Sequence, residues 1–177
     1  MLDEKRIKEA EKNVRDYIES GMLKKQPFQE EIISILQNNA QESIEIAELL
    51  LKSKKSDLWI IVTSYYAMFY KANAILFKLG YKVGDKIPHK ITSDALIVFV
   101  RNKLKKSILE EYEEAQNEAL PGIRADTLID EFDKERIKRS IIQYETKAIE
   151  KHAKAITSLE RAKEFLFEIK KLLESLN

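Results

Sequence analysis

The residues best suited to bind a ligand lie three and four positions apart between residues 63 and 77. They are Thr63, Tyr66, Tyr70, Asn73 and Phe77. This spacing places them on one face of a helix. Aromatic faces stack on nucleobases, and an asparagine can hydrogen-bond the edge of a base, so the stripe could line a binding groove. The same spacing also arises when tyrosines pack inside a bundle with satisfied hydroxyls and Asn73 bonds a neighbouring helix, so both interpretations stay open.

A second candidate site surrounds His89, which follows Pro88 at the predicted start of a helix. Backbone N–H groups and the helix dipole favour an anion at such a position. Lys86 and Lys90 lie alongside in the sequence. A phosphate site is therefore one hypothesis, and an exposed loop histidine or a helix cap is the alternative.

A third group of polar side chains shares one face of the last predicted helix. Its members are Arg136, Arg139, Gln143 and Lys147. They could hold a phosphate or an acidic partner. The alternative is a solvated face whose cations pair with Glu135 and Glu150.

The sequence predicts no metal site and no cofactor. It has no cysteine, which excludes thiolate metal sites, disulfides and cysteine nucleophiles. The two potential ligands His152 and Glu145 are one heptad apart, about 10 Å along a helix, which is too far for one ion within a chain. A buried interaction between them that specifies helix pairing is the expectation.

Glycine and proline divide the chain into helical segments. All seven of these residues fall within residues 21–27, 80–88 and 121–122. Because both residue types interrupt helices, the stretches between them predict long helices. Apolar periodicity places these helices at about 2–20, 28–52, 57–79, 94–119 (as one helix or two) and 128–175, with a turn at 53–57 that Ser56 or Asp57 could cap.

The segment 57–79 is apolar over most of its circumference, so we place it at the centre of the bundle. The run Ala95–Val100 could pass for a strand, but no second strand candidate exists to pair with it. The fold is therefore predicted to be all-α, a single up-and-down bundle of five to six helices spanning residues 1–177.

The last predicted helix carries a small or apolar residue every seven positions from Ile141 to Leu176. As one straight helix it would exceed roughly 65 Å. A compact domain of this size spans only about 40 Å. The helix therefore either bends around 130–140 or projects to meet a second subunit.

Charge and composition favour no partner class. The chain has 31 basic and 30 acidic residues, so its net charge of +1 does not indicate nucleic acid or membrane binding. The first residues are charged and lack the apolar segment of a signal peptide. We expect a cytoplasmic protein with no membrane association.

The central segment also carries a family resemblance. Residues 59–76 read WIIVTSYYAMFYKANAIL, and Gly80 and the loop histidine His89 follow. Residues 139–146 read RSIIQYET, and residues 162–165 fit an A-x-x-F pattern. These features resemble the prokaryotic, nucleotidyltransferase-associated branch of the HEPN family. The resemblance covers about residues 28–175 and leaves a first helix at 2–20 as an addition.

The resemblance implies a helical bundle that forms a homodimer and is often encoded beside a minimal nucleotidyltransferase. It further implies roles in toxin–antitoxin systems, nucleotide binding or RNA cleavage. RNA-cleaving members carry Arg-x(4–6)-His. The required positions before His89 hold Lys82, Val83 and Gly84, and those before His152 hold Glu145, Thr146 and Lys147. The motif is absent.

The resulting expectation is a non-catalytic, HEPN-type dimeric binding module that partners a minimal nucleotidyltransferase, binds a nucleotide, or both. The candidate binding residues are Tyr66, Tyr70, Asn73, His89, Lys90, Arg136, Arg139 and Tyr144. One alternative is a ribonuclease with a degenerate site built from His89, Tyr144 and Arg139 across a dimer. The other is a structural interaction module without a ligand.

Overall fold

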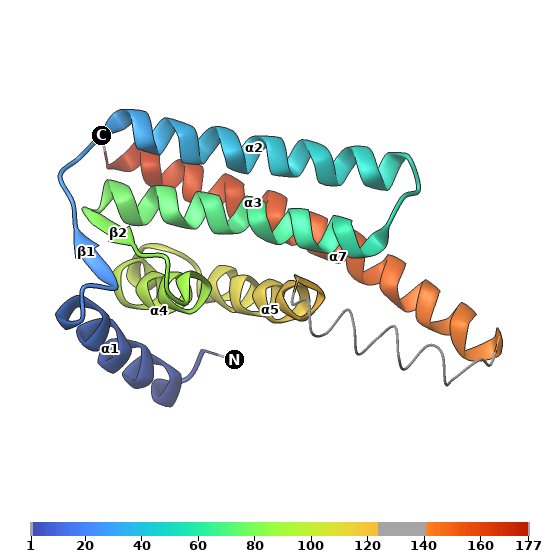
Figure 1. The fold of residues 1–177 in the computed structure, drawn as a ribbon, viewed down its shortest axis with the longest axis horizontal. Coiled ribbons are helices and arrows are strands. Elements are labelled where there is room, and N and C mark those ends of the chain that lie inside the picture. The colour runs from blue at the N-terminus through green and yellow to red at the C-terminus, as the bar shows by residue number, and fades with distance from the viewer. Residues whose placement is uncertain (1, 124–140, 177) are drawn as a thin grey trace.

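The structure is a computed structural model that describes residues 2–123 and 141–176, with side chains described up to residue 121 and again from Glu150. Six α-helices lie within these residues, and the predicted all-α bundle is confirmed (Figure 1). The helices are α1 Glu4–Glu19, α2 Glu30–Lys52, α3 Asp57–Lys78, α4 Pro88–Phe99, α5 Lys106–Ile123 and α7 Ile141–Ser175. A 3-10 turn, η1, spans Arg101–Lys103.

Helix α3 is the core of the bundle, as its apolar circumference predicts. It packs against α2, α4, α5 and α7, so it is covered on most sides (Figure 1). Tyr65, Met68, Ala72, Ile75 and Leu76 are fully buried on it. Ser56 caps its first turn by accepting a hydrogen bond from the Trp59 N–H at 3.4 Å.

The same apolarity makes α3 the one helix in the described part of the chain that could cross a membrane by length and composition alone. The bundle buries 72% of the relevant window. A helix surrounded by other helices needs this composition, so core packing accounts for it.

Helices α2 and α3 run antiparallel and pack closely along their whole length (Figure 1). Small residues explain the close packing. Ala40 and Ala47 on α2 and Ala67 and Ala74 on α3 are all buried, and on each helix the two residues are seven positions apart. Such spacing keeps small side chains on the contact face of both helices.

A two-stranded antiparallel sheet was not predicted. Strands β1 (Leu23–Lys25) and β2 (Tyr81–Val83) pair, with Leu23 opposite Val83. The expectation that no strand could find a partner was therefore wrong. Three residues are too short for an alternating pattern, and both strands lie in the segments that glycine and proline marked as loops. Gly84 directly follows β2 and lies close to the backbone of Met22. A Cβ at this position would lie 2.9 Å from the Met22 carbonyl oxygen, so glycine fits where a larger residue would clash.

The segment 88–123 differs from its predicted boundaries. Helix α4 begins at Pro88 and not at Asp94, and Val100 ends it before α5 begins at Lys106. The apolar run Ala95–Phe99 is helical, as expected. Pro121 was expected to stop the next helix, but α5 continues to Ile123. A proline so near a helix end disturbs only the last turn.

Helix α7 has 35 residues, which corresponds to about 52 Å. Its predicted seven-residue line is fully buried at Ala155, Ala162 and Ile169 and partly buried at Leu176. Its first turns extend past the α2–α3 turn, so the helix projects from the bundle (Figure 1). The bend considered at 130–140 lies outside the described residues.

His152 corrects one expectation. A buried contact with Glu145 was predicted, but the His152 side chain is half exposed and its Nδ1 lies 2.8 Å from Asp57 Oδ1. Among the described side chains of α7, Ala155 is the first that is buried, and His152, which precedes it, lies beside Asp57 at the start of α3. The Glu145 side chain lies outside the described residues.

We expect Ile87→Asn to raise the free energy of unfolding by about 1 kcal/mol. Ile87 precedes Pro88 and has φ 44° and ψ 44°, a left-handed conformation that strains a β-branched side chain. Its side chain is 54% exposed, so little burial is lost. Urea unfolding measures the difference. Ile46→Asn, at an equally exposed isoleucine within α2, should give no gain, and equal effects of the two changes would contradict the prediction.

Candidate functional site

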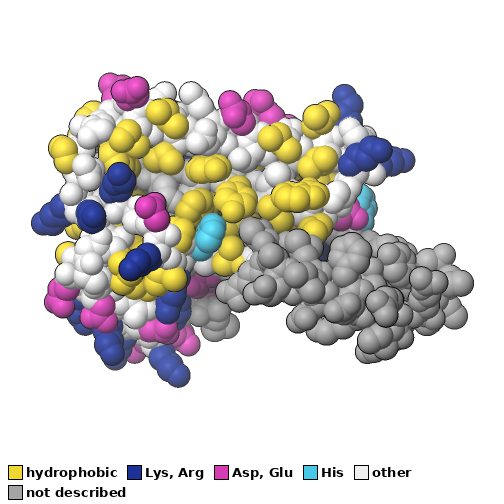
Figure 2. All heavy atoms as spheres, in the orientation of Figure 1, with side chains coloured by type: hydrophobic (Ala, Val, Ile, Leu, Met, Phe, Trp, Pro, Cys, Tyr) yellow, Lys and Arg dark blue, Asp and Glu magenta, His cyan; other side chains and the backbone are white. Residues whose placement is uncertain are grey.

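The predicted aromatic stripe on α3 opens onto a groove of about 480 Å³, here called the aromatic groove. Residues of α2, α3, β2 and the start of α4 line it. They are Ile32, Leu36, Phe69, Tyr70, Asn73, Phe77, Tyr81, Lys82, Val83, Gly84, Asp85 and Pro88. Figure 2 shows hydrophobic side chains gathered across the face of the molecule that α2, α3 and α4 form.

The structure brings most of the predicted stripe together. Tyr70, Asn73 and Phe77 line the groove, and the Tyr66 ring adjoins it with its centroid 6.0 Å from that of Tyr70. Thr63 does not take part, because its hydroxyl donates to the Trp59 carbonyl at 2.7 Å within the helix. The groove is therefore lined by the last two turns or so of the predicted stripe, from Tyr70 to Phe77, and by β2.

The hydroxyls of Tyr66 and Tyr70 make no hydrogen bond to the described residues. Both side chains are half-buried, and burial, followed by the neighbouring Tyr70, raises the pKa of Tyr66. The Tyr66 phenol therefore stays protonated at neutral pH and can donate or accept. This differs from the alternative in which packing within the bundle satisfies the hydroxyls.

Asn73 has a fixed orientation in the groove. Its Nδ2 donates to the Phe69 carbonyl oxygen at 2.8 Å and to Thr92 Oγ1 at 3.3 Å. A carbonyl oxygen only accepts hydrogen bonds, so the amide nitrogen and not the oxygen must face it. The Oδ1 atom accepts no hydrogen bond from the described residues.

His89 lies in the first turn of α4 beside the same aromatic side chains. Its Nδ1 is 2.8 Å from the Tyr65 hydroxyl. Its ring centroid is 4.5 Å from that of Phe69, and it meets the Tyr66 ring edge-on at 6.0 Å. Burial lowers the pKa of His89 and raises that of Tyr65. The imidazole is therefore neutral at pH 7, with Nε2 as its remaining polar atom.

Behind Tyr65 lies Tyr112, whose ring centroid is 6.0 Å away. Burial raises the pKa of Tyr112 well above its usual value. The two hydroxyls are close enough to influence each other, but their geometry does not meet that of a hydrogen bond, and the Tyr112 hydroxyl is buried without a partner. The hydrogen-bond partner of His89, Tyr65, therefore packs against the fully buried core residue Tyr112.

We expect His89 to make the free energy of unfolding depend on pH. Its pKa in the folded state is below the unfolded value of about 6.5, so below that pH the unfolded chain binds a proton that the folded chain resists. Stability should therefore fall as pH drops from 7 to 5. Urea unfolding of His89→Phe should show a smaller fall. His152→Asn, at the exposed histidine, should keep the wild-type fall, and a full loss of the pH effect in that variant would contradict the assignment.

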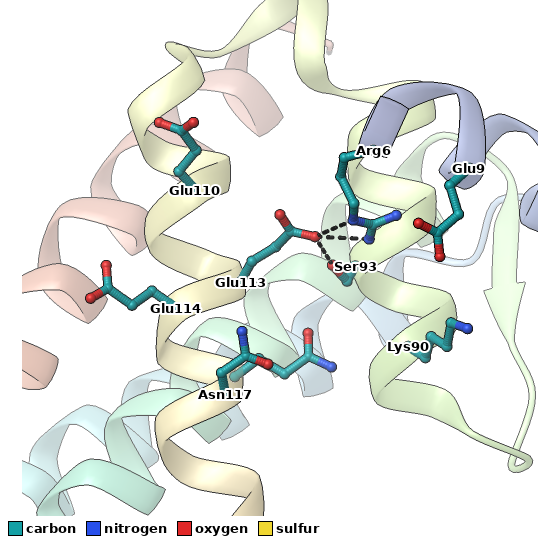
Figure 3. A pocket seen from close by; sticks show the side chains of 9 residues that line it. Arg6, Glu9, Lys90, Ser93, Glu110, Glu113, Glu114 and Asn117 are labelled. Atoms are coloured by element: carbon teal, nitrogen blue, oxygen red, sulfur yellow. Dashed lines mark hydrogen bonds and ion pairs between the residues drawn. The ribbon is translucent and has the colours of Figure 1, made fainter. Parts of the chain in front are cut away.

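Lys90 lies apart from the aromatic groove. It lines a second groove of about 680 Å³ between α1, α4 and α5, together with Arg6, Glu9, Ser93 and Glu113 (Figure 3). Neighbouring residues of a helix point in different directions, so His89 and Lys90 turn to different sides of α4. His89 and Lys90 therefore do not face a common groove, and the phosphate site expected from the two together is not formed.

The remaining candidates cannot be placed. Arg136 and Arg139 lie outside the described residues, and Tyr144 is in α7 with its side chain outside them. Among the described residues, no group of three or more histidine or acidic side chains could hold a metal ion.

Sequence reasoning missed several groove residues. Tyr81, Lys82 and Val83 belong to β2, which no pattern indicated. Phe69 was not part of the predicted stripe, and it is half-buried at the border between core and groove. Comparisons of the chain with protein-family models and with curated proteins found no match.

Proposed function

We propose that this chain is a non-catalytic, HEPN-type binding module that forms a homodimer, binds a nucleotide in the aromatic groove and has a minimal nucleotidyltransferase as its protein partner. The aromatic groove carries this proposal. Aromatic rings on two sides and a small number of unpaired polar atoms are the usual features of a small-molecule site. Its volume of about 480 Å³ lies within the range of ligand pockets.

The groove offers each contact that a nucleotide needs. The half-buried ring of Tyr70 provides a face on which a base can stack, whereas Phe77 is only 3% exposed and lies beneath the groove as part of the core. Asn73 Oδ1 is an acceptor for a base edge, and the exposed Lys82 at the rim is a cation for a phosphate. Because the lining is mostly apolar, a stacked base would displace water from the Tyr70 ring and from apolar side chains beside it.

The non-catalytic part of the proposal rests on the missing motif. Transesterification at RNA needs a cation that stabilises the phosphate, and no arginine stands at the family spacing from either histidine. Cleavage of total RNA by the purified protein that disappears in His89→Ala would contradict this part.

Exposed apolar side chains support the homodimer. Ile46 and Leu49 near the end of α2 and Trp59 near the start of α3 are about half exposed or more. Apolar groups concentrated at one end of a bundle are typical of a surface that another protein covers.

The nucleotidyltransferase partner rests on the family resemblance alone, and copurification with a nucleotidyltransferase encoded beside this chain tests it.

We expect AMP to bind the wild-type protein and Tyr70→Ala to bind it about 5- to 150-fold more weakly. Stacking on one aromatic ring contributes about 1–3 kcal/mol, and 1.4 kcal/mol corresponds to a factor of ten. Isothermal titration calorimetry measures both affinities. Phe167→Ala, at an exposed phenylalanine of α7 outside the groove, should leave the affinity unchanged. Undiminished affinity in Tyr70→Ala would contradict the groove as the site.

A further inference from the structure

The amide of Asn73 limits which bases the aromatic groove can take. Both N–H bonds of its Nδ2 point to acceptors, the Phe69 carbonyl oxygen at 2.8 Å and Thr92 Oγ1 at 3.3 Å. Reversing the amide would place Oδ1 against the Phe69 carbonyl oxygen, two acceptors in contact. The side chain therefore presents its oxygen, and only its oxygen, to a ligand.

The surroundings hold this orientation. Thr92 is fully buried on α4, so its hydroxyl cannot move away toward solvent. The Phe69 carbonyl belongs to the backbone of α3 four residues before Asn73, so its position is fixed by the helix. Asn73 thus links α3 to α4 through its nitrogen and leaves Oδ1, with two lone pairs, at the groove it lines.

A ligand that buries this oxygen must offer it a hydrogen-bond donor. An amide oxygen that loses water without gaining a donor destabilises the complex by about 1–3 kcal/mol. The edges of nucleobases differ in this respect. Adenine and cytosine carry an exocyclic amino group that donates, whereas unsubstituted purine has no N–H donor on the corresponding edge.

Resting on the proposed function, we propose that the aromatic groove is selective for an amino-bearing nucleobase, whose exocyclic N–H donates to Asn73 Oδ1 while its ring stacks on Tyr70. Asn73 is the residue that determines specificity, and Tyr70 contributes affinity to any base. Selectivity and affinity therefore reside in different side chains, and variants can separate them.

The test compares AMP with purine riboside monophosphate, which differs from AMP only by lacking the 6-amino group. Calorimetry with the wild-type protein should show AMP binding about 5- to 150-fold more tightly, the factor that corresponds to one unsatisfied acceptor. Asn73→Ala should abolish this preference, because it removes the oxygen that AMP satisfies and that purine riboside monophosphate leaves without a donor. Tyr70→Ala should weaken both ligands and keep the preference.

A second variant covers the case in which Asn73→Ala does not fold. Thr92→Val removes one acceptor and leaves the Phe69 carbonyl in place, so the preference for AMP should persist. Equal affinity of the wild-type protein for both ligands would overturn the selectivity and leave the nucleotide site standing. Binding of neither ligand would overturn the proposed function itself, together with the selectivity.

Discussion

Replacing Asp94 by alanine is expected to lower the free energy of unfolding by about 3 kcal/mol. The Asp94 carboxylate is fully buried. Its Oδ1 lies 2.6 Å from Arg6 Nη2, and its Oδ2 accepts hydrogen bonds from Asn13 Nδ2 and the Tyr17 hydroxyl, both at 3.0 Å. All three partners belong to α1, so Asp94 holds that helix against α4.

The size of the effect follows from what the substitution leaves behind. Removing one partner of a buried ion pair costs about 3–5 kcal/mol, because the other charge stays buried. Arg6 keeps Glu113, whose Oε1 lies 2.8 Å from both Nε and Nη2, which places the expected loss at the lower end (Figure 3). Burial, reinforced by the charge of Asp94, raises the pKa of Tyr17, so its hydroxyl remains a donor that also loses its acceptor.

Urea unfolding and hydrogen exchange of α1 measure this prediction. The matched control is Lys163→Ala, which breaks the exposed pair between Lys163 and Glu48 at 3.0 Å. Exposed pairs contribute about 0–1 kcal/mol, so this control should change little. If Asp94→Ala and Lys163→Ala had similar effects, the buried carboxylate would not anchor α1.

Phe165→Ala is expected to cost about 3–5 kcal/mol, the usual range for removing a buried phenylalanine. The Phe165 side chain is fully buried on α7, and its ring centroid lies 5.3 Å from that of Tyr112. Tyr112 in turn packs on Tyr65, which bonds His89. A cavity at Phe165 would therefore remove packing from Tyr112, which supports Tyr65 and His89 beside the aromatic groove.

The control for Phe165→Ala lies two residues away on the same helix. Phe167 is 57% exposed and contacts Lys171 Nζ at 4.0 Å from its ring centroid. Phe167→Ala loses only that cation–π contact, about 0.5–1 kcal/mol at an exposed site. Urea unfolding should separate the two variants clearly, and equal losses would contradict the packing of α7 into the core.

Local patterns were enough to predict the bundle and part of the groove. The apolar circumference of 57–79 correctly placed α3 at the centre, since only a surrounded helix can bury side chains on every side. Spacings of three and four correctly placed Tyr70, Asn73 and Phe77 on one face, because helical periodicity alone decides that.

The contacts between distant segments could not be predicted in this way. The pairing of Leu23 with Val83 joins strands too short to leave a pattern. The bond between Tyr65 and His89 depends on how α4 packs against α3, and the bonds of Asp94 depend on how α1 packs against α4. Each of these contacts joins segments that are far apart in the sequence, and the periodicity within one segment cannot predict it.

The most direct test of the central claim is a titration of ¹⁵N-labelled protein with AMP, followed by NMR. We predict that saturating AMP shifts the resonances of residues that line the aromatic groove, including the side-chain amide of Asn73 and the backbone of Gly84. Resonances of the polar groove around Arg6 and Glu113 should stay in place. Shifts confined to the polar groove, or no shift at millimolar AMP, would contradict the proposed nucleotide site.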